Sequence, residues 1–218
     1  MGVISSEKYT RTLKSLANRR VVAVFFLGFA SGLPLALTGG TLQAWMAVEG
    51  VDLKTIGFFS LVGLPYAFKF FWAPLLDRYA LPFLGRRRGW ILGTQLVLMI
   101  LIVMLGFTSP KDTPWLVALF ALLLTFTSAS QDIVFDAYRT DVLREKERGL
   151  GAAVSVTGYR IAMLASGALA LILAGPLGWR STYLLMACQM LIGIMATIFG
   201  PEPEETVRPP QSLKEAIS

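Results

Sequence analysis

The chain has 218 residues, of which 55% are hydrophobic and 16% are charged, with a net charge of +6 and a mean hydropathy of +0.61. About a quarter of the residues of a soluble domain are charged, so this composition excludes an ordinary soluble protein and favours an integral membrane protein. With one cysteine and no histidine, the chain can form no internal disulfide and lacks the commonest metal ligand and proton shuttle.

Six long apolar segments follow one another, each long enough to cross a hydrocarbon core of about 30 Å as a helix. Helices are expected because lipid cannot satisfy the hydrogen-bonding groups of an open backbone. The first segment is too long for a cleaved signal sequence, and more spans follow it. The predicted fold class is therefore an all-α membrane protein with six transmembrane helices. These are predicted at residues 21–48, 54–77, 89–108, 114–141, 149–174 and 179–200.

The positions of Lys and Arg predict how the spans are oriented. Fifteen of the 20 lie before the first span, after the second, after the fourth or after the sixth. Only Lys54, Lys111 and Arg180 lie on the opposite side. Positively charged loops favour the cytoplasm, so both termini are predicted to be cytoplasmic. The basic charge thus indicates topology and affinity for anionic lipid, and nucleic acid is not an expected partner.

Two polar regions flank the predicted transmembrane domain of residues 21–200. Residues 1–20 form a cytoplasmic N-terminal segment, either a short helix on the membrane surface or a frayed tail. Residues 201–218 are rich in Pro and Glu, and they have the composition of a linker towards a second half.

Ionisable side chains inside the spans are the strongest functional signal. At about 1.5 Å per residue, Arg160, Asp132 and Lys69 lie about 12–16 Å from the predicted cytoplasmic ends of their spans, and Asp136 about 8 Å. Charges at such depth are expensive and usually face a cavity or a partner. Asp132 and Arg160 have matching depths, so we expect them within ion-pair or one-water distance in at least one state. Alternatively, the pair only joins two helices.

Helical spacing predicts three polar faces that line one cavity. They belong to the second, fourth and fifth spans, and each combines a charge with hydroxyl or aromatic groups. The side chains concerned are Tyr66, Lys69 and Trp72; Ser128, Gln131, Asp132, Phe135, Asp136, Tyr138 and Arg139; and Thr157 and Arg160.

The first span contains the pattern G-x-x-x-G at Gly28 and Gly32, which lets another helix approach closely. Pro34 removes one backbone hydrogen bond further along the span. Tight packing is the favoured interpretation, and a partly broken helix beside the site is the alternative.

Missing motifs narrow the function. The chain has no phosphate-binding loop, no H-E-x-x-H pattern and no cysteine cluster, so neither ATP hydrolysis nor a zinc enzyme is expected, and we predict no metal and no cofactor. Buried carboxylates and cations facing a cavity favour gradient-driven transport by a protein that is not an enzyme. The alternatives are a membrane scaffold and an intramembrane transferase using Asp132 and Lys69.

The loop "WAPLLDRYALPFLGRRRGW" resembles the signature loop of the major facilitator superfamily, roughly G-x-L-x-D-R-x-G-R-K. It departs from that pattern because Ala73 replaces the leading glycine and six residues separate the two halves of the motif instead of one. The matching residues, which the resemblance makes a gating loop, are Asp77, Arg78, Gly85, Arg86 and Arg87.

Longer stretches, "GFASGLPLALTGGTLQAWM", "LKTIGFFSLVGLPYAFKFFWAPLLDRY", "GRRRGW" and "SASQDIVFDAYRTDVL", together resemble the N-terminal half of AmpG-type muropeptide permeases. The resemblance runs from about Phe26 to Pro203. A related acetyl-CoA transporter branch shares a Q-D-I-x-x-D element, so acetyl-CoA or another anionic solute is the alternative substrate.

The resemblance implies a facilitator of the bacterial inner membrane with at least twelve helices, of which this chain supplies one six-helix half. Such permeases import anhydro-muropeptides, which are wall fragments made of an aminosugar disaccharide and a short peptide, together with protons. They serve wall recycling and, in some bacteria, β-lactamase induction and thereby antibiotic resistance. The expected partners are the substrate, protons, the lipid bilayer and a second six-helix half.

Such a substrate suggests a role for each polar residue. Carboxylates of the peptide would bind Arg160 and Lys69. Gln131 would hydrogen-bond sugar or amide groups. Asp132 or Asp136 would carry the coupling proton. The aromatic residues expected to stack on sugar faces are Tyr66, Trp72 and Tyr138.

Overall fold

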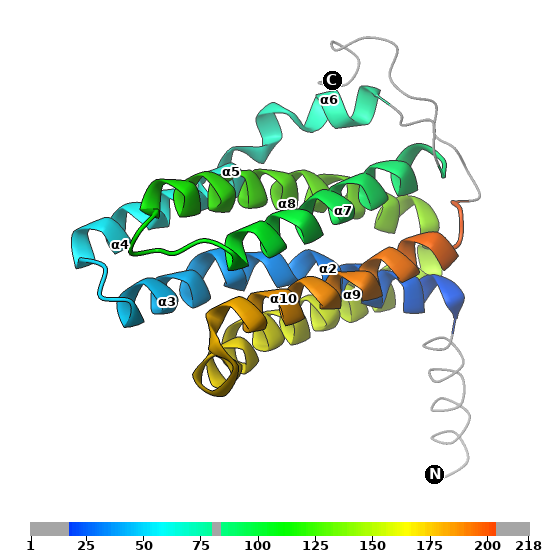
Figure 1. Cartoon of the computed structure of the whole chain (residues 1–218). Coiled ribbons are helices and arrows are strands. Elements are labelled where there is room, and N and C mark those ends of the chain that lie inside the picture. The colour runs from blue at the N-terminus through cyan, green and yellow to red at the C-terminus, as the bar shows by residue number, and fades with distance from the viewer. Residues whose placement is uncertain (1–17, 80–83, 204–218) are drawn as a thin grey trace, which may run out of the picture.

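The computed structural model describes residues 18–79 and 84–203, and these two ranges form helices and no β-strand (Figure 1). The predicted N-terminal surface helix and most of the predicted linker lie outside the described residues. In chain order the elements are α2 (Arg19–Ala36), η1 (Leu37–Thr41), α3 (Leu42–Val48), α4 (Leu53–Phe59), η2 (Ser60–Gly63), α5 (Leu64–Phe68), η3 (Lys69–Phe71), α6 (Ala73–Arg78), α7 (Arg86–Gly106), α8 (Pro114–Val142), η4 (Glu145–Glu147), α9 (Arg148–Leu164), η5 (Ala165–Leu169) and α10 (Ala170–Phe199).

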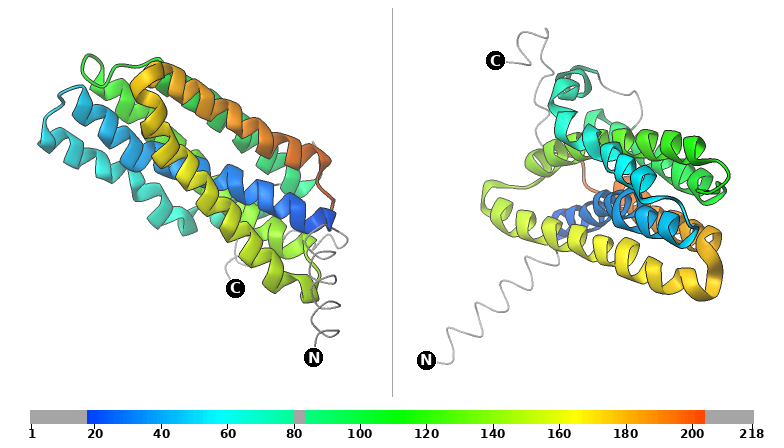
Figure 2. Two further views of the ribbon diagram at one scale, coloured as in Figure 1. Left: turned by 90° about the horizontal axis from the view of Figure 1, so that it is seen from below. Right: turned by 90° about the vertical axis from the view of Figure 1, so that its left-hand side faces the viewer.

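These elements make six crossings of the bundle. Four helices in the described part are long and apolar enough to span a membrane, namely Arg19–Val48, Arg87–Gly106, Pro114–Val142 and Glu145–Phe199. The last has 55 residues and reverses direction at Gly178, where φ is 77° and ψ is 159°, so it supplies two crossings (Figure 2). Helices α4 to α6 supply the remaining crossing (Figure 1). The six-helix prediction is confirmed.

The second crossing is not the single helix predicted over residues 54–77. It is a series of short α-helices separated by the 3₁₀ turns η2 and η3. Pro65 and Pro74 stand in the first turns of α5 and α6. A proline has no backbone N–H and clashes with the preceding turn, so each restarts the helix. The interruptions lie on both sides of Tyr66, and Lys69 is the first residue of the second one.

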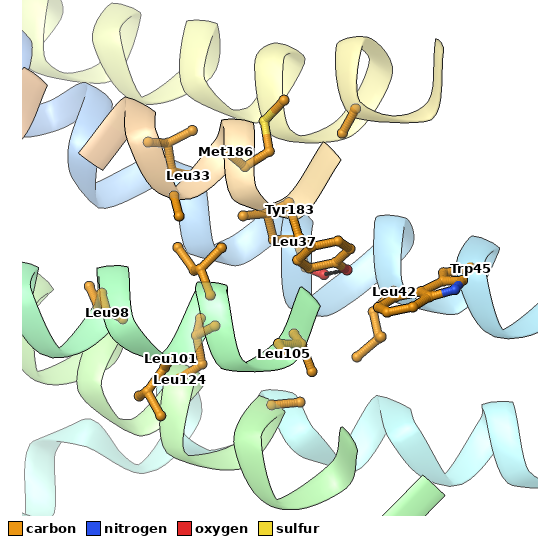
Figure 3. Packing of buried hydrophobic residues seen from close by; sticks show 14 of the residues in the cluster. Leu33, Leu37, Leu42, Trp45, Leu98, Leu101, Leu105, Leu124, Tyr183 and Met186 are labelled. Carbon is orange, nitrogen blue, oxygen red and sulfur yellow. Dashed lines mark hydrogen bonds between the residues drawn. The ribbon is translucent and has the colours of Figure 1, made fainter. Parts of the chain in front are cut away.

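The core is an apolar cluster shared by the crossings, shown in Figure 3. The indole rings of Trp45 and Trp179 stack with centroids 5.7 Å apart, and the ring of Tyr183 lies 5.1 Å from Trp45. Many large apolar side chains are exposed on the outside of the bundle, among them Ile100, Phe126 and Ile172. A lipid-facing surface has this character, since lipid tails are as apolar as the side chains.

Helices α2 and α9 approach so closely that their backbones touch. A Cβ atom added at Gly28 would collide with the carbonyl oxygen of Ser155, and one at Gly32 with that of Tyr159. On the opposing helix, a Cβ atom at Gly158 would collide with the carbonyl oxygen of Phe25. The two glycines singled out in the first span therefore lie at the contact with the fifth crossing.

The π-helical segments η1 and η5 lie against each other, beyond that contact. The Thr41 hydroxyl donates to the carbonyl oxygen of Ser166 at 2.7 Å, and the Tyr183 hydroxyl to that of Leu37 at 3.0 Å. These hydroxyls donate hydrogen bonds to carbonyl oxygens of η1 and η5, where the regular α-helical hydrogen-bond pattern is interrupted. The break in the first span thus lies one turn after Pro34, and Gly39 within it has non-helical torsion angles.

Both ends of the described chain lie at the same end of the bundle (Figure 1). The Arg19 guanidinium donates to the carbonyl oxygen of Phe199 from Nε at 3.2 Å and from a terminal nitrogen at 2.7 Å. We call this the basic end, because Arg19, Arg20, Arg87 and Arg88 gather there. At the opposite end lie Lys54, in the first turn of α4, and Lys111, in the turn between α7 and α8.

Candidate functional site

A polar pocket of about 240 Å³ lies between α2, α8 and α9. Its lining combines two carboxylates, one guanidinium and three hydroxyl groups with two apolar side chains. We call it the Asp132 pocket, and its residues are Ser31, Asp132, Phe135, Asp136, Arg139, Ser155, Val156 and Tyr159. Polar lining at this depth is what a water-filled passage or a substrate site requires.

Asp132 is the pocket residue on α8 that lies farthest from the basic end, and it accepts a hydrogen bond from a residue of another helix. The Ser31 hydroxyl, which is 2% exposed, donates a hydrogen bond to its carboxylate. Ser31 directly precedes Gly32, so the packing of α2 on α9 also fixes where Ser31 meets α8. Lys69 is the cation that acts electrostatically on the Asp132 carboxylate. The fourth crossing is therefore joined at Asp132 to the first by a hydrogen bond.

Arg139 and Asp136 lie nearer the basic end. The guanidinium lies 3.0 Å from the Asp136 carboxylate, three residues earlier on α8, and it donates to the Ser155 hydroxyl on α9 at 3.4 Å. It also lies 6.0 Å from the centre of the Phe135 ring. The side chain of Asp136 is 54% exposed. Arg139 thus bridges α8 and α9 at the more open side of the pocket.

Arg160 is exposed in this conformation, and no ion pair within 4.0 Å joins it to Asp132 in the described part of the chain. The proximity of the two stays a prediction for another state. Tyr159, the residue before Arg160, lines the pocket instead. Because adjacent residues of a helix point about 100° apart, Arg160 faces away from Tyr159 towards the surface of the described bundle.

None of the three residues singled out on the second crossing, Tyr66, Lys69 and Trp72, lines the Asp132 pocket. The Trp72 indole N–H donates to the Ser130 hydroxyl at 3.0 Å, and its ring lies 4.8 Å from that of Phe126. Trp72 therefore packs beside α8, outside the Asp132 pocket.

Tyr138 and Gln131 are also outside the pocket, since each is 1% exposed. The Tyr138 hydroxyl donates to the carbonyl oxygen of Pro201 at 2.7 Å, so it holds the chain that leaves α10. Its ring lies in an apolar cluster with Val134 and Val142. Neither side chain can reach a substrate in this conformation, because both point into the bundle.

Sequence reasoning missed the three lining residues that contribute hydroxyl groups, Ser31, Ser155 and Tyr159, as well as the apolar Val156. Each of the three carries only a hydroxyl, which an intrahelical carbonyl often satisfies, so a lone serine or tyrosine in an apolar span gives little signal. For Ser31, the signal that was present was its position between Gly28 and Gly32, in a stretch that brings another helix into backbone contact.

The loop after the second crossing forms an ionic junction at the basic end. The Arg87 guanidinium lies 2.5 Å from the Asp77 carboxylate at the end of α6 and 3.2 Å from the Asp141 carboxylate at the end of α8. Gly85 has φ of 79°, in the left-handed region that favours glycine. Arg78 is exposed, with its guanidinium 5.8 Å from the Tyr79 ring centre. Within the predicted signature loop, an ion pair thus joins Arg87 to Asp77.

Arg88, beside that junction, caps the end of α10. It donates to the carbonyl oxygens of Thr197 at 2.9 Å and Ile198 at 2.7 Å, and it pairs with Glu202 at 2.8 Å. The last carbonyl groups of a helix have no hydrogen-bond partner within the helix. Here side chains from α2, α7 and α8 donate hydrogen bonds to these carbonyl oxygens and to that of Pro201. The direction in which the chain leaves the bundle is therefore fixed.

Comparison with known proteins gives a consistent result. The model of the Major Facilitator Superfamily matches residues 24–217. The chain is 56% identical over 207 residues to the anhydromuropeptide permease of Escherichia coli K12, covering 94% of this chain and 42% of that protein. It is 34% identical over 194 residues to the putative transporter AmpG 4 of Rickettsia conorii, covering 87% and 46%. An uncharacterized protein of Haemophilus influenzae is 44% identical over 187 residues, covering 85% and 44%. The chain thus spans less than half the length of each.

Proposed function

This chain belongs to the Major Facilitator Superfamily, and from that premise we propose that it forms a six-helix wall of a proton-coupled permease that imports anhydro-muropeptides. The observation that carries the proposal is Asp132. This carboxylate lies deep in the bundle, lines a polar pocket and is held by Ser31 from another helix. The identity of more than half with an anhydromuropeptide permease supports the choice of substrate.

Asp132 has the surroundings that a coupling carboxylate needs. Both a cation, Lys69, and a second acid, Asp136, act electrostatically on it, so small movements of the crossings change the electrostatic balance around it. A carboxylate in such a position takes up a proton in one state of the transporter and releases it in another. The movement of the helices then links proton transfer to substrate movement.

Cationic groups near the pocket suit an acidic peptide. The Arg139 guanidinium lines the pocket, and Arg160 lies exposed one residue beyond Tyr159. Guanidinium groups bind carboxylates through paired, charge-assisted hydrogen bonds. The Tyr159 ring offers a surface for a sugar face. We therefore assign recognition of the peptide carboxylates to Arg139 and Arg160, with Lys69 acting on Asp132.

A second half completes the proposed site. Pockets for small molecules usually have volumes of about 300–1,000 Å³, and the Asp132 pocket with about 240 Å³ is too small to enclose a disaccharide with a peptide. Transporters of this kind bind substrate between two halves near the middle of the membrane. We propose a further six-helix half opposite α8 and α9, in the same polypeptide or in a separate chain.

The proposed location is the bacterial inner membrane, with the basic end in the cytoplasm. The concentration of arginine at that end and the scarcity of cations at the other support this orientation. Both ends of the described chain lie at the basic end, so both termini would be cytoplasmic.

Uptake of labelled anhydro-muropeptide tests the proposal. The complete transporter is expressed in cells that lack their own permease, and accumulation is measured with and without a protonophore. We expect accumulation that collapses when the proton gradient is removed. Competition by unlabelled acetyl-CoA, or accumulation that ignores the protonophore, would contradict the assigned substrate or the coupling respectively.

A further inference from the structure

Two apolar grooves lie on the outside of the bundle, one on each side of α2. The first, which we call the α2–α9 groove, has a volume of about 400 Å³ and is lined by Val21, Val22, Phe25, Phe26, Val154 and Thr157. The second, the α2–α10 groove, has a volume of about 390 Å³ and is lined by Phe26, Leu191, Ile192, Met195 and Ala196. Phe26 lines both grooves, so its side chain forms a ridge that separates them.

The grooves exist because the fifth and sixth crossings diverge from each other towards the basic end. These crossings are joined by the reversal at Gly178, at the opposite end, and α2 lies between them and packs against both (Figure 2). The outer face of α2 is therefore uncovered near the basic end, where Val22 is 39% and Phe26 is 38% exposed.

The α2–α9 groove faces away from the Asp132 pocket. Val154 and Thr157 line the groove, whereas Ser155 and Tyr159 line the pocket. Because successive residues of a helix point about 100° apart, these two pairs lie on opposite sides of Gly158, which contacts α2. A partner half that covers the pocket therefore leaves the groove facing the bilayer.

The chemistry and the depth of both grooves suit acyl chains. The lining is apolar apart from Thr157, whose hydroxyl already donates to a carbonyl oxygen of its own helix at 2.9 Å. At about 1.5 Å per residue, Phe26 lies about 10 Å from Arg19, and Leu191 about 12 Å from Phe199. Half of a hydrocarbon core is about 15 Å thick, so both grooves lie within the leaflet at the basic end.

A cation stands at the basic end of the ridge. Arg19, Val22 and Phe26 are spaced i, i+3 and i+7, so they share one face of α2. Arg19 is exposed, and its guanidinium donates two hydrogen bonds to the carbonyl oxygen of Phe199. A guanidinium has more N–H donors than these two bonds use, so it can also bind a phosphate. A phosphate at Arg19 has an apolar groove on each side of the ridge beneath it.

We propose that this site binds one anionic phospholipid of the leaflet at the basic end, with its phosphate at Arg19 and one acyl chain in each groove. A phospholipid has one phosphate and two chains, which matches one cation above two grooves. The arginines gathered at the basic end favour an anionic headgroup over a zwitterionic one. The bound lipid fastens α2 to α9 and α10 on the side away from the Asp132 pocket, and its binding does not depend on the transported substrate.

Native mass spectrometry of the complete transporter tests the headgroup. The protein is stripped of lipid in detergent, and phosphatidylglycerol or phosphatidylcholine is added back in steps. We expect one phosphatidylglycerol to bind, and phosphatidylcholine to need an about tenfold higher concentration for the same occupancy. In Arg19→Gln, phosphatidylglycerol should bind about tenfold more weakly, which is the usual effect of losing a charge-assisted hydrogen bond.

Arg88→Gln is the matched control for Arg19→Gln. The Arg88 guanidinium also donates to the last carbonyl oxygens of α10, but it belongs to α7 and lies away from the ridge. This variant loses the same charge and the same kind of helix cap, and it should bind phosphatidylglycerol like the unaltered protein. Equal weakening in both variants, or equal binding of the two lipids, would overturn the proposal.

Tryptophan substitutions test the grooves themselves. Thr157→Trp fills the α2–α9 groove and Leu191→Trp fills the α2–α10 groove, so each displaces one acyl chain and should weaken phosphatidylglycerol binding about tenfold or more. Thr140→Trp on α8 and Leu96→Trp on α7 are the controls, since both positions are exposed and line neither groove. Unchanged binding in both groove variants would overturn the proposal, because a protein segment would then fill the grooves. Equal loss in the controls would overturn it as well, because the lipid would then be held by the apolar surface in general.

Discussion

Ser31 on α2 donates its hydroxyl hydrogen to the carboxylate of Asp132 on α8. The bond crosses between the first and fourth crossings, at the point where α2 also meets α9 through Gly28 and Gly32. Any movement of α2 relative to α8 must therefore change the hydrogen bonding of Asp132. This relationship gives a direct physical link between helix movement and the proposed coupling group.

Ser31→Ala removes that donor, and we expect gradient-driven accumulation to fall about tenfold or more. A hydrogen bond to a charged group is worth about 1.5–3 kcal/mol. Ser31→Thr keeps a hydroxyl and should retain more accumulation than Ser31→Ala. Thr94→Val is the control, because the Thr94 hydroxyl donates only to carbonyl oxygens of its own helix, those of Trp90 and Ile91. Accumulation in Ser31→Ala equal to that of the control would contradict this role.

The contact between α2 and α9 should not tolerate a methyl group. In Gly28→Ala the new Cβ would meet the backbone of Ser155, which cannot move without shifting α9. Overpacking of this kind costs about 1–3 kcal/mol. Thermal unfolding in detergent should show a lower midpoint for Gly28→Ala and for Gly158→Ala. Gly149→Ala, at a helical position with open space, should unfold no earlier than the unaltered protein.

The number and order of the crossings could be predicted from the sequence, because few backbone conformations are stable in lipid. Apolar segments of sufficient length must be helices, and lysine and arginine mark their ends. The reversal at Gly178 fell between two predicted spans for this reason. The breaks in the second crossing were not predicted, because Pro65 and Pro74 fit helices that restart as well as helices that kink.

The site could be predicted only in part. Depth along a helix predicted a polar cavity at Asp132 and Asp136, and both residues line the Asp132 pocket. Depth does not tell which side of a helix faces a neighbour, so Tyr138 and Gln131 were expected at the pocket although they are buried. Ser31 could not be assigned, because its importance arises from a helix that is distant in sequence.

Arg87 should stabilise the basic end by joining three crossings. In Arg87→Ala, the carboxylates of Asp77 and Asp141 lose their shared cation and repel each other. Breaking a fully buried pair costs about 3–5 kcal/mol, and we expect less here because the side chains are partly exposed, with Asp77 at 36%. Thermal unfolding of Arg87→Ala should begin earlier, and adding Asp77→Asn and Asp141→Asn should restore part of the loss. No recovery in the triple variant would argue against an ionic origin.

Single cysteines test the orientation of the bundle. Cys188 is exposed and is first replaced by serine. In intact cells whose outer membrane is permeable, a membrane-impermeant thiol reagent should label Lys111→Cys, at the opposite end. It should label Lys146→Cys, at the basic end, only after the inner membrane is opened. Both residues are exposed, so access depends on the side of the membrane. The reverse pattern would contradict the proposed topology.

The last prediction separates the two aspartates. Asp132→Asn keeps the shape of the side chain but removes its titration, so it should abolish gradient-driven accumulation of anhydro-muropeptide while the protein still reaches the membrane and still exchanges substrate. Asp136→Asn should have a smaller effect. Its side chain is 54% exposed, and its ion pair with Arg139 spans only three residues of one helix, a kind of pair worth about 0.3–0.5 kcal/mol.

Membrane level, exchange and accumulation are therefore measured together for both asparagine variants. Full accumulation by both would place the transported proton elsewhere in the complete transporter. Loss of folded protein in Asp132→Asn alone would show that this carboxylate mainly holds α2 against α8, because its hydrogen bond to Ser31 would then be needed for folding and not for coupling.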